Sequence, residues 1–335
     1  MEKVLRWLNL LLVVVTFIAY ASPYINPSHI WFFSIIGMAY PWLLLFNLCF
    51  IFGWLLTKKW YFLFSVGCIL MGWNHFQSFV GINNSTSALE KELTVMSFNA
   101  MSYYKMKGDI LESFSQTLAQ LNPDIICMQE AFSRTSPINK KTYPYVFQPK
   151  NKKLLIYSKY PFANSGNLNM GNTSNGCTFV DLKFNKQIIR IYNIHLQSNR
   201  VSSDASKLRE EGDLQEADTW VDVGTMLKKV RRAAIIRTEQ AEKILNHTKS
   251  TSSPIIICGD MNETPLSYPY RLFSNKLKDG FKEKGVGIGT TYNGVIPLLR
   301  IDYIWVDNQL RINDYSVIKK NFSDHFPVVS RIQLN

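Results

Sequence analysis

The chain has 335 residues, which is enough for one large domain and a second, smaller region. Its 37 Lys and Arg against 25 Asp and Glu give a net charge of +12. This charge favours a polyanion or an anionic lipid surface as binding partner. The alternative is that the basic charge has no relation to any partner. Its five cysteines lack the spacing of a disulfide framework or a zinc site, which argues against both classes.

Residues 1–82 differ in composition from the rest of the chain. They contain three apolar segments, each near the ~20 residues that a helix needs to cross the hydrocarbon core of a bilayer. These segments are 8–20, 30–56 and 60–80. We expect a transmembrane region of three spanning helices at 1–82. A cleaved signal peptide is the alternative for the first segment.

The basic side chains of this region predict its orientation. They lie before the first segment and between the second and third, at Lys3, Arg6, Lys58 and Lys59. By the positive-inside rule these ends face the cytoplasm. Three spans then make a multi-pass membrane protein with the remaining domain on the non-cytoplasmic side. Residues 83–92 are small and polar and are typical of a short linker, so a domain at 93–335 is held close to the lipid bilayer.

Periodicity predicts the regular elements of this domain. Apolar residues recur at three- and four-residue steps from Ile110 to Leu121, which predicts a helix that ends at Asn122 before Pro123. The runs 178–184 and 187–195 predict a hairpin. A second helix is expected at 230–246, with Arg231, Arg232 and Arg237 on its solvated face.

Two further stretches show no clear element. Residues 197–229 include a part that is dense in charge and poor in large apolar groups. We interpret them as an insertion near the site, either helical or a solvated loop. Residues 285–294 are rich in glycine and predict a loop at the rim of the site, but they contain no Gly-Lys-Ser/Thr of a P-loop.

Four short apolar runs of the domain end in a polar side chain. The residues at these ends are Asn99, Glu130, His195 and Asp260. Asn262 follows Asp260 by two positions, and residues two apart in an extended chain point the same way. Because α/β sheets carry their chemistry beyond the ends of strands, we expect one composite site at one rim of a pair of sheets.

Two more motifs add to this set. Asp302 stands near the start of the apolar run 301–306, and Asp324 and His325 belong to a Ser-Asp-His-Phe-Pro stretch near the C-terminus. A carboxylate in an apolar strand is expensive to bury alone, so Asp302 needs a partner. Carboxylate and amide oxygens suit a hard divalent cation, which predicts Mg²⁺ as cofactor, with Mn²⁺ as the alternative.

In this order, six motifs resemble those of the endonuclease/exonuclease/phosphatase superfamily. The motifs are S-F-N-A, I-I-C-M-Q-E, Y-N-I-H-L, G-D-M-N-E-T-P, R-I-D-Y-I-W-V and S-D-H-F-P-V, and the resemblance runs from about Leu93 to the C-terminus. It implies an α/β fold, a four-layer sandwich with two mixed sheets face to face and helices outside, here preceded by three transmembrane helices. It also implies metal-dependent cleavage of phosphodiesters or phosphomonoesters.

The same resemblance implies roles for single residues. Glu130 would be the principal metal ligand, with Asn99 and Asp324 completing the protein's share. Asp260 would orient or deprotonate the attacking water, and Asn262 would hydrogen-bond a phosphate oxygen or the nucleophile. His325 would donate to the phosphate with Asp302 as its orienting carboxylate. His195 would be a second phosphate donor or the leaving-group acid.

Three functions follow as hypotheses. The first is a membrane-anchored endonuclease or exonuclease that acts on nucleic acid outside the cytoplasm. The second is a phospholipid phosphodiesterase of the sphingomyelinase kind, or a phosphatase, at the membrane surface. The third is a non-catalytic receptor or scaffold on the same fold, against which the complete set of polar residues argues. The expected partners are a phosphodiester substrate and the bilayer; no protein partner is inferred.

Overall fold

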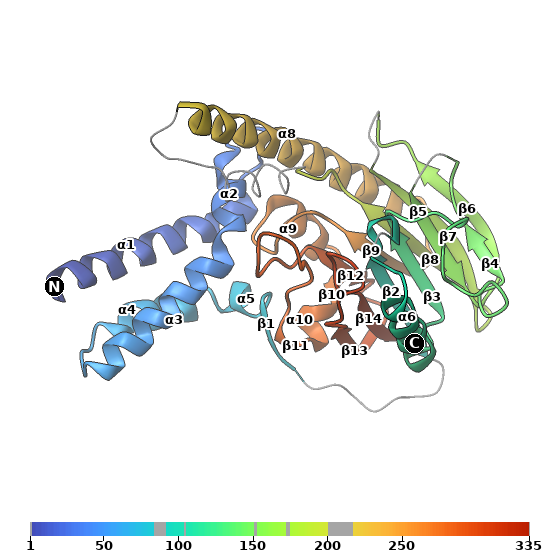
Figure 1. Ribbon diagram of the computed structural model, residues 1–335, viewed down its shortest axis with the longest axis horizontal. Helices are drawn as coiled ribbons and strands as arrows, with labels where there is room; N and C mark the ends of the chain where they lie inside the picture. The colour runs from blue at the N-terminus through green and yellow to red at the C-terminus, as the bar shows by residue number, and fades with distance from the viewer. Residues whose placement is uncertain are drawn as a thin grey trace.

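The computed structural model describes residues 2–83, 92–103, 105–150, 153–171, 175–199 and 217–334. Two six-stranded sheets lie face to face and form the body of the molecule (Figure 1). Each sheet contains one parallel pair of strands, and its other pairs are antiparallel, so both sheets are mixed. The predicted α/β fold with two mixed sheets is therefore confirmed.

The first sheet has the strand order β10-β12-β9-β8-β7-β6. Its strands are β6 (Phe162–Leu168), β7 (Gly176–Phe184), β8 (Gln187–His195), β9 (Ile255–Asp260), β10 (Lys278–Asp279) and β12 (Asp302–Val306). Strands β7 and β8 form the predicted hairpin. Their turn at Asn185 and Lys186 has positive φ at both residues, which matches the right-handed twist of the strands.

The second sheet has the order β13-β14-β2-β3-β5-β4. Its strands are β2 (Glu92–Asn99), β3 (Ile125–Gln129), β4 (Tyr145–Phe147), β5 (Leu154–Ser158), β13 (Arg311–Val317) and β14 (Val328–Gln333). Strands β2 and β3 are parallel and are joined by helix α6 (Asp109–Leu121). Asn122 ends this helix in the left-handed conformation, where the sequence predicted the end.

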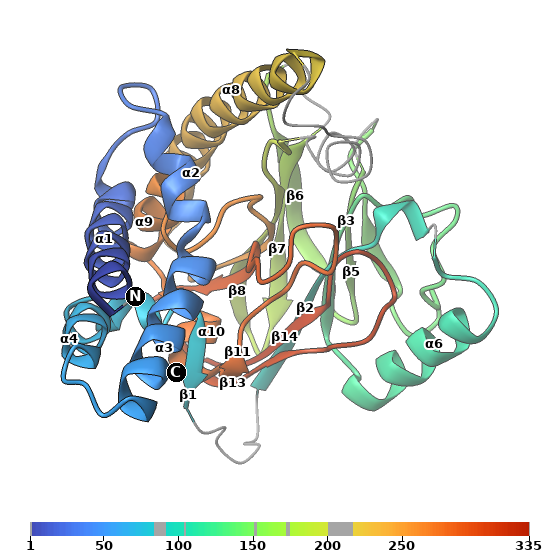
Figure 2. The same ribbon diagram turned by 60° about the vertical axis from the view of Figure 1, so that its left-hand side comes forward.

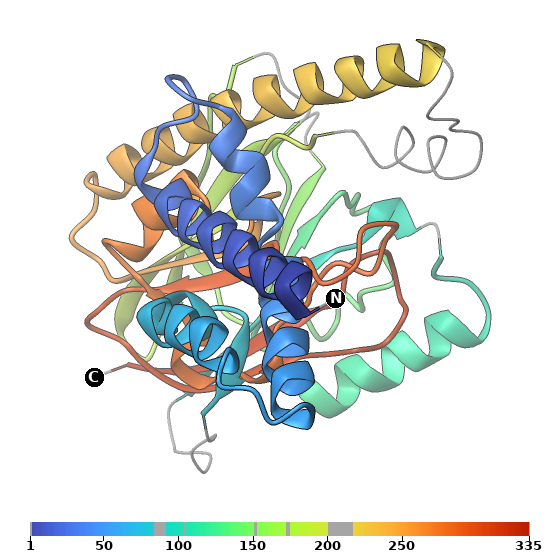
Figure 3. The same ribbon diagram turned by 90° about the vertical axis from the view of Figure 1, so that its left-hand side faces the viewer.

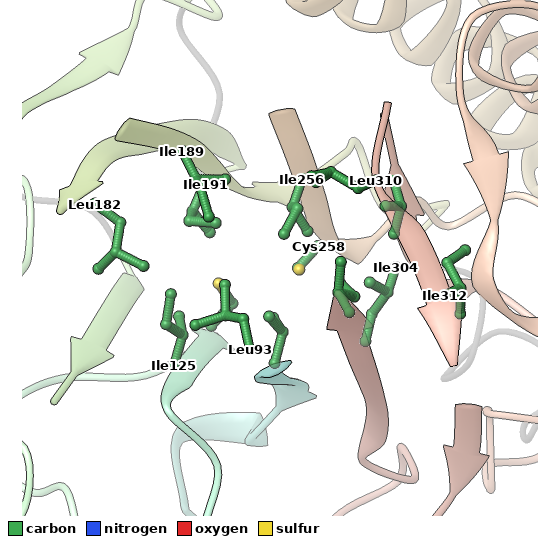
Figure 4. Packing of buried hydrophobic residues seen from close by; sticks show 14 of the residues in the cluster. Leu93, Ile125, Leu182, Ile189, Ile191, Ile256, Cys258, Ile304, Leu310 and Ile312 are labelled. Atoms are coloured by element: carbon green, nitrogen blue, oxygen red, sulfur yellow. The ribbon is translucent and has the colours of Figure 1, made fainter. Parts of the chain in front are cut away.

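Aliphatic side chains from both sheets fill the space between them. Figure 4 shows Leu93 and Ile125 of the second sheet directed toward Ile191 and Ile256 of the first. On the outer face of the second sheet, Phe114 of α6 packs against Phe98. Helices α8 (Ala217–Thr248) and α9 (Tyr268–Ser274) cover the outer face of the first sheet. The layers are thus helix, sheet, sheet and helix.

Helix α8 differs from the helix that the sequence predicted. It begins at Ala217, inside the stretch predicted as an insertion, and ends at Thr248. The part of that insertion at 200–216 lies outside the described residues. Arg231 and Arg232 are exposed, as predicted, but Arg237 is fully buried. The prediction of a solvated Arg237 was wrong because the residue occupies the inner face of α8, between buried Ala233 and Ala241.

The N-terminal region is a set of short and long helices rather than three spans. It contains α1 (Glu2–Ala21), a 3-10 turn η1 (Ser22–Tyr24), α2 (Phe32–Met38), α3 (Tyr40–Leu56), α4 (Phe62–Met71) and α5 (Trp73–Phe76). One helical stretch, Glu2–Tyr24, is long and apolar enough to cross a membrane, and a second span results only if α2 and α3, bent by 49°, count as one. The third predicted span is not shown: α4 has only 10 residues, fewer than a spanning helix needs.

The third apolar segment is interrupted at Gly72. This residue separates α4 from α5, and a Cβ here would lie 2.1 Å from the Tyr20 hydroxyl. The close approach of the Tyr20 ring therefore requires glycine at this position. Beyond α5 the chain enters strand β1 (Val80–Ile82), which pairs with β11 (Val286–Ile288) of the following domain. Part of the predicted rim loop 285–294 is thus a strand.

Helices α1, α3 and α4 pack together and extend away from the sheets (Figures 1 and 3). Their shared interior is polar at several points: Asn9 donates to Ser65, and the indole of Trp54 donates to Asn9. The side-chain amide of Asn47 donates to the hydroxyl of Thr16. Of the 30 large apolar side chains exposed in the described residues, 23 lie within residues 4–82. The bundle is therefore apolar outside and hydrogen-bonded inside.

Candidate active site

The ends of neighbouring strands bring the predicted polar residues together. Strand β8 runs parallel to β9 with His195 opposite Asp260, and β12 runs antiparallel to β9 with Asp302 opposite Asp260. Asn99 ends β2 of the facing sheet, and its side-chain amide donates to Oδ2 of Asp260 at 3.1 Å. Three strands of one sheet and one of the other therefore meet at Asp260.

A pocket of about 360 Å³ opens at this rim. Of the eight residues that the sequence predicted for the site, seven line it. They are Asn99, Glu130, His195, Asp260, Asn262, Asp324 and His325. Asp302 does not line the pocket but lies behind His325, with 1% of its surface exposed.

Asp260 is the central carboxylate of the pocket. Its Oδ1 accepts the backbone N–H of Asn262 at 2.8 Å, which turns the chain after β9 and holds Asn262 at positive φ. Its Oδ2 lies 3.6 Å from Nε2 of His195 and 3.8 Å from Nε2 of His325. Asp260 is thus flanked by one imidazole on each side while its own position is fixed by amide donors.

Gly259 permits this arrangement. It has a φ of 142°, and a Cβ there would lie 1.9 Å from the carbonyl oxygen of Ile194. Any side chain would therefore push β9 away from β8 at the residue before Asp260. The glycine in the Gly-Asp-Met-Asn stretch is needed so that His195 and Asp260 can stand on adjacent strands at this close distance.

His325 and Asp302 form a buried hydrogen-bonded pair. Nδ1 of His325 lies 2.9 Å and 3.1 Å from the two carboxylate oxygens of Asp302. Burial works against the charged imidazole, but the carboxylates of Asp302, Asp260 and Asp324 outweigh it and raise the pKa of His325 to about 10. The ring is therefore protonated at neutral pH, with Nδ1–H directed at Asp302 and Nε2–H on the side of Asp260.

Glu130, Asn99 and Asp324 offer oxygen atoms to the same pocket. Glu130 follows β3 at a φ of 49°, and its side chain is 36% exposed, with Oε1 3.9 Å from Nε2 of His195. Oδ1 of Asn99 accepts the N–H of Met101, and Oδ1 of Asp324 lies 3.2 Å from the hydroxyl oxygen of Ser323. Two carboxylates and an amide are a donor set that fits Mg²⁺ or Mn²⁺.

A second group of possible metal ligands includes Asp260. Asp260, Asp302 and His325 each offer one ligand atom, and these atoms lie within 4.8 Å of one another. Nδ1 of His325 is engaged by Asp302, which leaves only Nε2 of this ring for an ion. That Asn99, Glu130 and Asp324 hold the ion stays a prediction.

The sequence did not identify several residues that hold this site in place. The hydroxyl of Thr291 accepts the backbone N–H groups of Ile301 and Asp302, each at 3.0 Å. The hydroxyl of Ser323 donates to the carbonyl of Asn99 at 2.7 Å and accepts the N–H of His325. Ser323 belongs to the Ser-Asp-His motif and could have been found there; Thr291 gave no signal.

Arg237 supports the loop that follows Asp260. Its Nε lies 2.7 Å from Oε1 of Glu263, and both side chains are almost fully buried. Its Nη1 donates to the carbonyl of Gln197 and to Oδ1 of Asn199, just after β8. Burial raises the pKa of Glu263, and the guanidinium opposes this shift. The ion pair thereby ties α8 to the chain beyond both His195 and Asp260.

Helix α2 of the N-terminal region also reaches the pocket. Ile35 and Met38 line it together with Met226, Leu227 and Val230 of α8. Figure 2 shows α2 beside α8, and the two helices are in contact. No feature of the sequence predicted this, because nothing in an apolar segment indicates which distant loop it packs on.

Comparisons with known proteins agree with this geometry. A model described as the endonuclease/exonuclease/phosphatase family matches residues 96–325, and one described as a domain of unknown function (DUF8431) matches residues 2–79. No curated protein matches the sequence significantly.

Solved structures share the fold at low sequence identity. An endonuclease/exonuclease/phosphatase from Bacteroides vulgatus is similar with a TM-score of 0.54 and 17% identity, over 73% of this chain and 100% of that one. A mannosyl-6-phosphatase from Bacteroides thetaiotaomicron gives 0.52 and 17%, over 72% and 99%. The human nocturnin catalytic domain gives 0.52 and 17%, over 74% and 97%. With a family match over more than half of its length, the chain belongs to the endonuclease/exonuclease/phosphatase family and is a metal-dependent phosphoric ester hydrolase.

Proposed function

We propose that this protein is a membrane-anchored phosphodiester hydrolase that depends on Mg²⁺, with its catalytic domain on the non-cytoplasmic side. The observation that carries the chemistry is the position of Asp260. It is buried at the pocket, held by the amides of Asn99 and Asn262, and flanked by His195 and His325. A fixed carboxylate between two imidazoles is an arrangement for moving protons around a phosphate.

Hydrolysis of a phosphodiester joins the oxygen of water to phosphorus and breaks one P–O ester bond. The proton of water leaves, and the released alkoxide gains a proton. A divalent cation held by Glu130, Asn99 and Asp324 would supply charge neutralisation on the phosphate oxygens. We assign the removal of the water's proton, or its orientation, to Asp260, because its carboxylate is fixed and faces the pocket.

The remaining polar groups would bind the phosphate. His325 is cationic at neutral pH, and its Nε2–H can donate to a non-bridging oxygen while Asp302 holds the ring. Asn262 is placed to bind an oxygen of the phosphate or the nucleophile, and its amide also donates to the carbonyl of Leu196. His195, reached from a different strand, would be a second donor or would give its proton to the leaving oxygen.

Membrane anchoring is supported by the N-terminal bundle. Only 17% of the apolar window of α1 is buried, so α1 is not the core helix of a soluble domain. Hydrogen bonds between Asn9, Ser65 and Trp54 join the helices inside, as polar residues do in membrane bundles.

The charges of the bundle support its orientation. Lys59 pairs with Glu2 at 3.2 Å, so the N-terminus and the 57–59 turn lie at the same end of the bundle. All four Lys and Arg of residues 1–82 belong to these two segments. The sheets lie at the opposite end (Figure 1). The positive-inside rule therefore favours a cytoplasmic tip, and a catalytic domain outside requires that α4 and α5 together make the third crossing.

Nucleic acid is one candidate substrate, since residues 83–335 carry +9 of the net charge. The substrate would be identified with a panel of plasmid DNA, RNA, sphingomyelin and bis(p-nitrophenyl) phosphate, each with Mg²⁺ and with a chelator. Hydrolysis of at least one diester that stops on chelation supports the proposal. Failure to hydrolyse any of them, by a folded protein with Mg²⁺, would leave the scaffold hypothesis standing instead.

A further inference from the structure

The N-terminal region contributes directly to the wall of the catalytic pocket. Ile35 and Met38 of α2 line the same pocket as Asp260 and His325, although they come from a segment more than 200 residues away in the sequence. Met226 and Leu227 of α8, which contacts α2, line the same pocket. A domain joined only by a flexible linker would not place membrane-region side chains beside the reacting groups.

Helix α2 is seated closely on the loop that follows the central carboxylate. A Cβ on Gly37 would lie 2.0 Å from the carbonyl oxygen of Leu266, so the backbone of α2 touches the backbone of this loop. The hydroxyl of Thr264 donates to the carbonyl of Gly37 at 3.5 Å. Leu266 is fully buried in a cluster with Tyr40 and Leu44 of α3. The N-terminal region and the catalytic loop are therefore one packed unit.

The pocket combines a polar floor with an apolar wall. Its floor presents the carboxylates and imidazoles described above, and its wall presents Ile35, Met38, Met226, Leu227 and Val230. Among the described residues that line it, none is Lys or Arg. A nucleic acid backbone would place further phosphates beyond the one cleaved, and the described lining of the pocket offers them no Lys or Arg. An apolar wall next to a phosphate site fits an ester that carries hydrocarbon.

The position of α2 sets where such a substrate would come from. Helix α3 begins at Tyr40, two residues after α2, and it belongs to the bundle with the exposed apolar surface. Phe32 and Ile30, at the start of α2 and just before it, are exposed at 45% and 43%. The pocket mouth thus lies at the end of the bundle that the proposed function places at the membrane surface.

We propose that α2 is a substrate-specificity element, and that the substrate is a membrane lipid with a phosphodiester head group whose apolar part contacts Ile35 and Met38. This inference rests on the proposed phosphodiester hydrolysis and names its substrate class. The cleaved bond, water and proton are those of the hydrolysis given above. The lipid would enter with its head group on the polar floor and its hydrocarbon between α2 and α8.

The test compares two substrates in full-length protein in mixed micelles. One is a long-chain lipid diester, phosphatidylcholine or sphingomyelin, and the other is the soluble bis(p-nitrophenyl) phosphate. The variant carries Ile35→Ala and Met38→Ala together. The matched control is Phe32→Ala, which removes an apolar side chain from the same helix at a position that does not line the pocket. Thermal unfolding of each variant shows whether it is folded.

We expect wild type to hydrolyse the lipid, and the double variant to lose about tenfold or more of kcat/KM on lipid relative to its change on the soluble diester. Phe32→Ala should leave this ratio as in wild type. If the double variant lost the same factor of kcat/KM on lipid and on the soluble diester, the role of α2 would be overturned. The same holds if Phe32→Ala changed the ratio as much as the double variant does. Cleavage of DNA or the soluble diester without any cleavage of lipid would overturn the lipid proposal while the hydrolase stands. Inactivity of wild type toward every diester would overturn the proposed function itself.

Discussion

The pair of His325 and Asp302 allows a quantitative test of how the site works. Asp302→Asn keeps the shape of the side chain but removes the charge that lies 2.9 Å from Nδ1 of His325. At this distance the attraction is about 6 kcal/mol for an effective dielectric constant of about 20. Without it, the pKa of His325 falls, although Asp260 and Asp324 still raise it, and Nδ1–H loses its charged acceptor. We therefore expect Asp302 to act on catalysis through His325.

This expectation fixes the result for the double variant. Asp302→Asn and His325→Ala should each lower kcat/KM about a hundredfold, or about 2.7 kcal/mol, as for a positioned donor. If Asp302 acts through His325, the double variant should be about as active as His325→Ala alone. The coupling free energy is then about 2.7 kcal/mol. Independent action would give a loss of about ten-thousandfold.

A matched cycle with His195 provides the control. His195 contacts Asp260 and Glu130, and it is reached from β8 rather than from β12. Asp302→Asn and His195→Ala should therefore have effects that come close to multiplying. All variants are assayed on one chromogenic diester, with unfolding measured in parallel. Multiplying effects of Asp302→Asn and His325→Ala would refute the pairing and would reassign Asp302.

Three further predictions concern the metal, the membrane and the fold. Glu130→Gln should lower activity by orders of magnitude at limiting Mg²⁺ and recover in part at high Mg²⁺, measured as a metal titration; wild-type activity at limiting metal would remove it from the ligands. Protease added to spheroplasts should cut the catalytic domain and spare a reporter in the 57–59 turn; protection of the domain until detergent is added would invert the topology. Chemical unfolding should show that Arg237→Met lowers the free energy of unfolding by about 3–5 kcal/mol, because Glu263 stays buried without its partner. The matched change at an exposed position, Arg232→Met, should lower it by about 0.5 kcal/mol or less. Burial raises the pKa of Glu263, so its carboxylate can take up a proton in the folded protein as the pH falls. A protonated Glu263 costs less to bury without Arg237, so the loss of unfolding free energy in Arg237→Met should shrink as the pH falls toward about 4. A loss that grows at lower pH would contradict this.

Local patterns explain why the sheet and much of the site could be predicted. The four apolar runs that end in a polar residue form strands β2, β3, β8 and β9, and those residues lie at or just beyond the ends of the strands. The parallel pairs β2–β3 and β8–β9 bring these ends to one rim, where antiparallel β12 begins with Asp302. The register of His195 and Asp302 on either side of Asp260 is the direct result. The need of buried Asp302 for a partner was also a physical argument, and the structure places His325 at hydrogen-bonding distance.

Tertiary contacts explain what could not be predicted. Arg237 was placed on the solvated face because of its charge, although its helical spacing from Ala233 and Ala241 puts it on the buried face. Its acceptors, Glu263, Gln197 and Asn199, are 26 to 40 residues away and make that position favourable. The third apolar segment breaks at Gly72, against which the ring of Tyr20 packs. Both outcomes depend on partners distant in the sequence, which composition and periodicity do not contain.

Hydrolysis of bis(p-nitrophenyl) phosphate by the full-length protein, with and without Mg²⁺, tests the central claim most directly when wild type is compared with Asp260→Asn. We predict turnover by wild type that stops with chelator and returns with Mg²⁺, and a loss of about a hundredfold or more in Asp260→Asn with unfolding unchanged. Turnover that persists in chelator, or a folded Asp260→Asn variant as active as wild type, would contradict a metal-dependent phosphoesterase centred on Asp260.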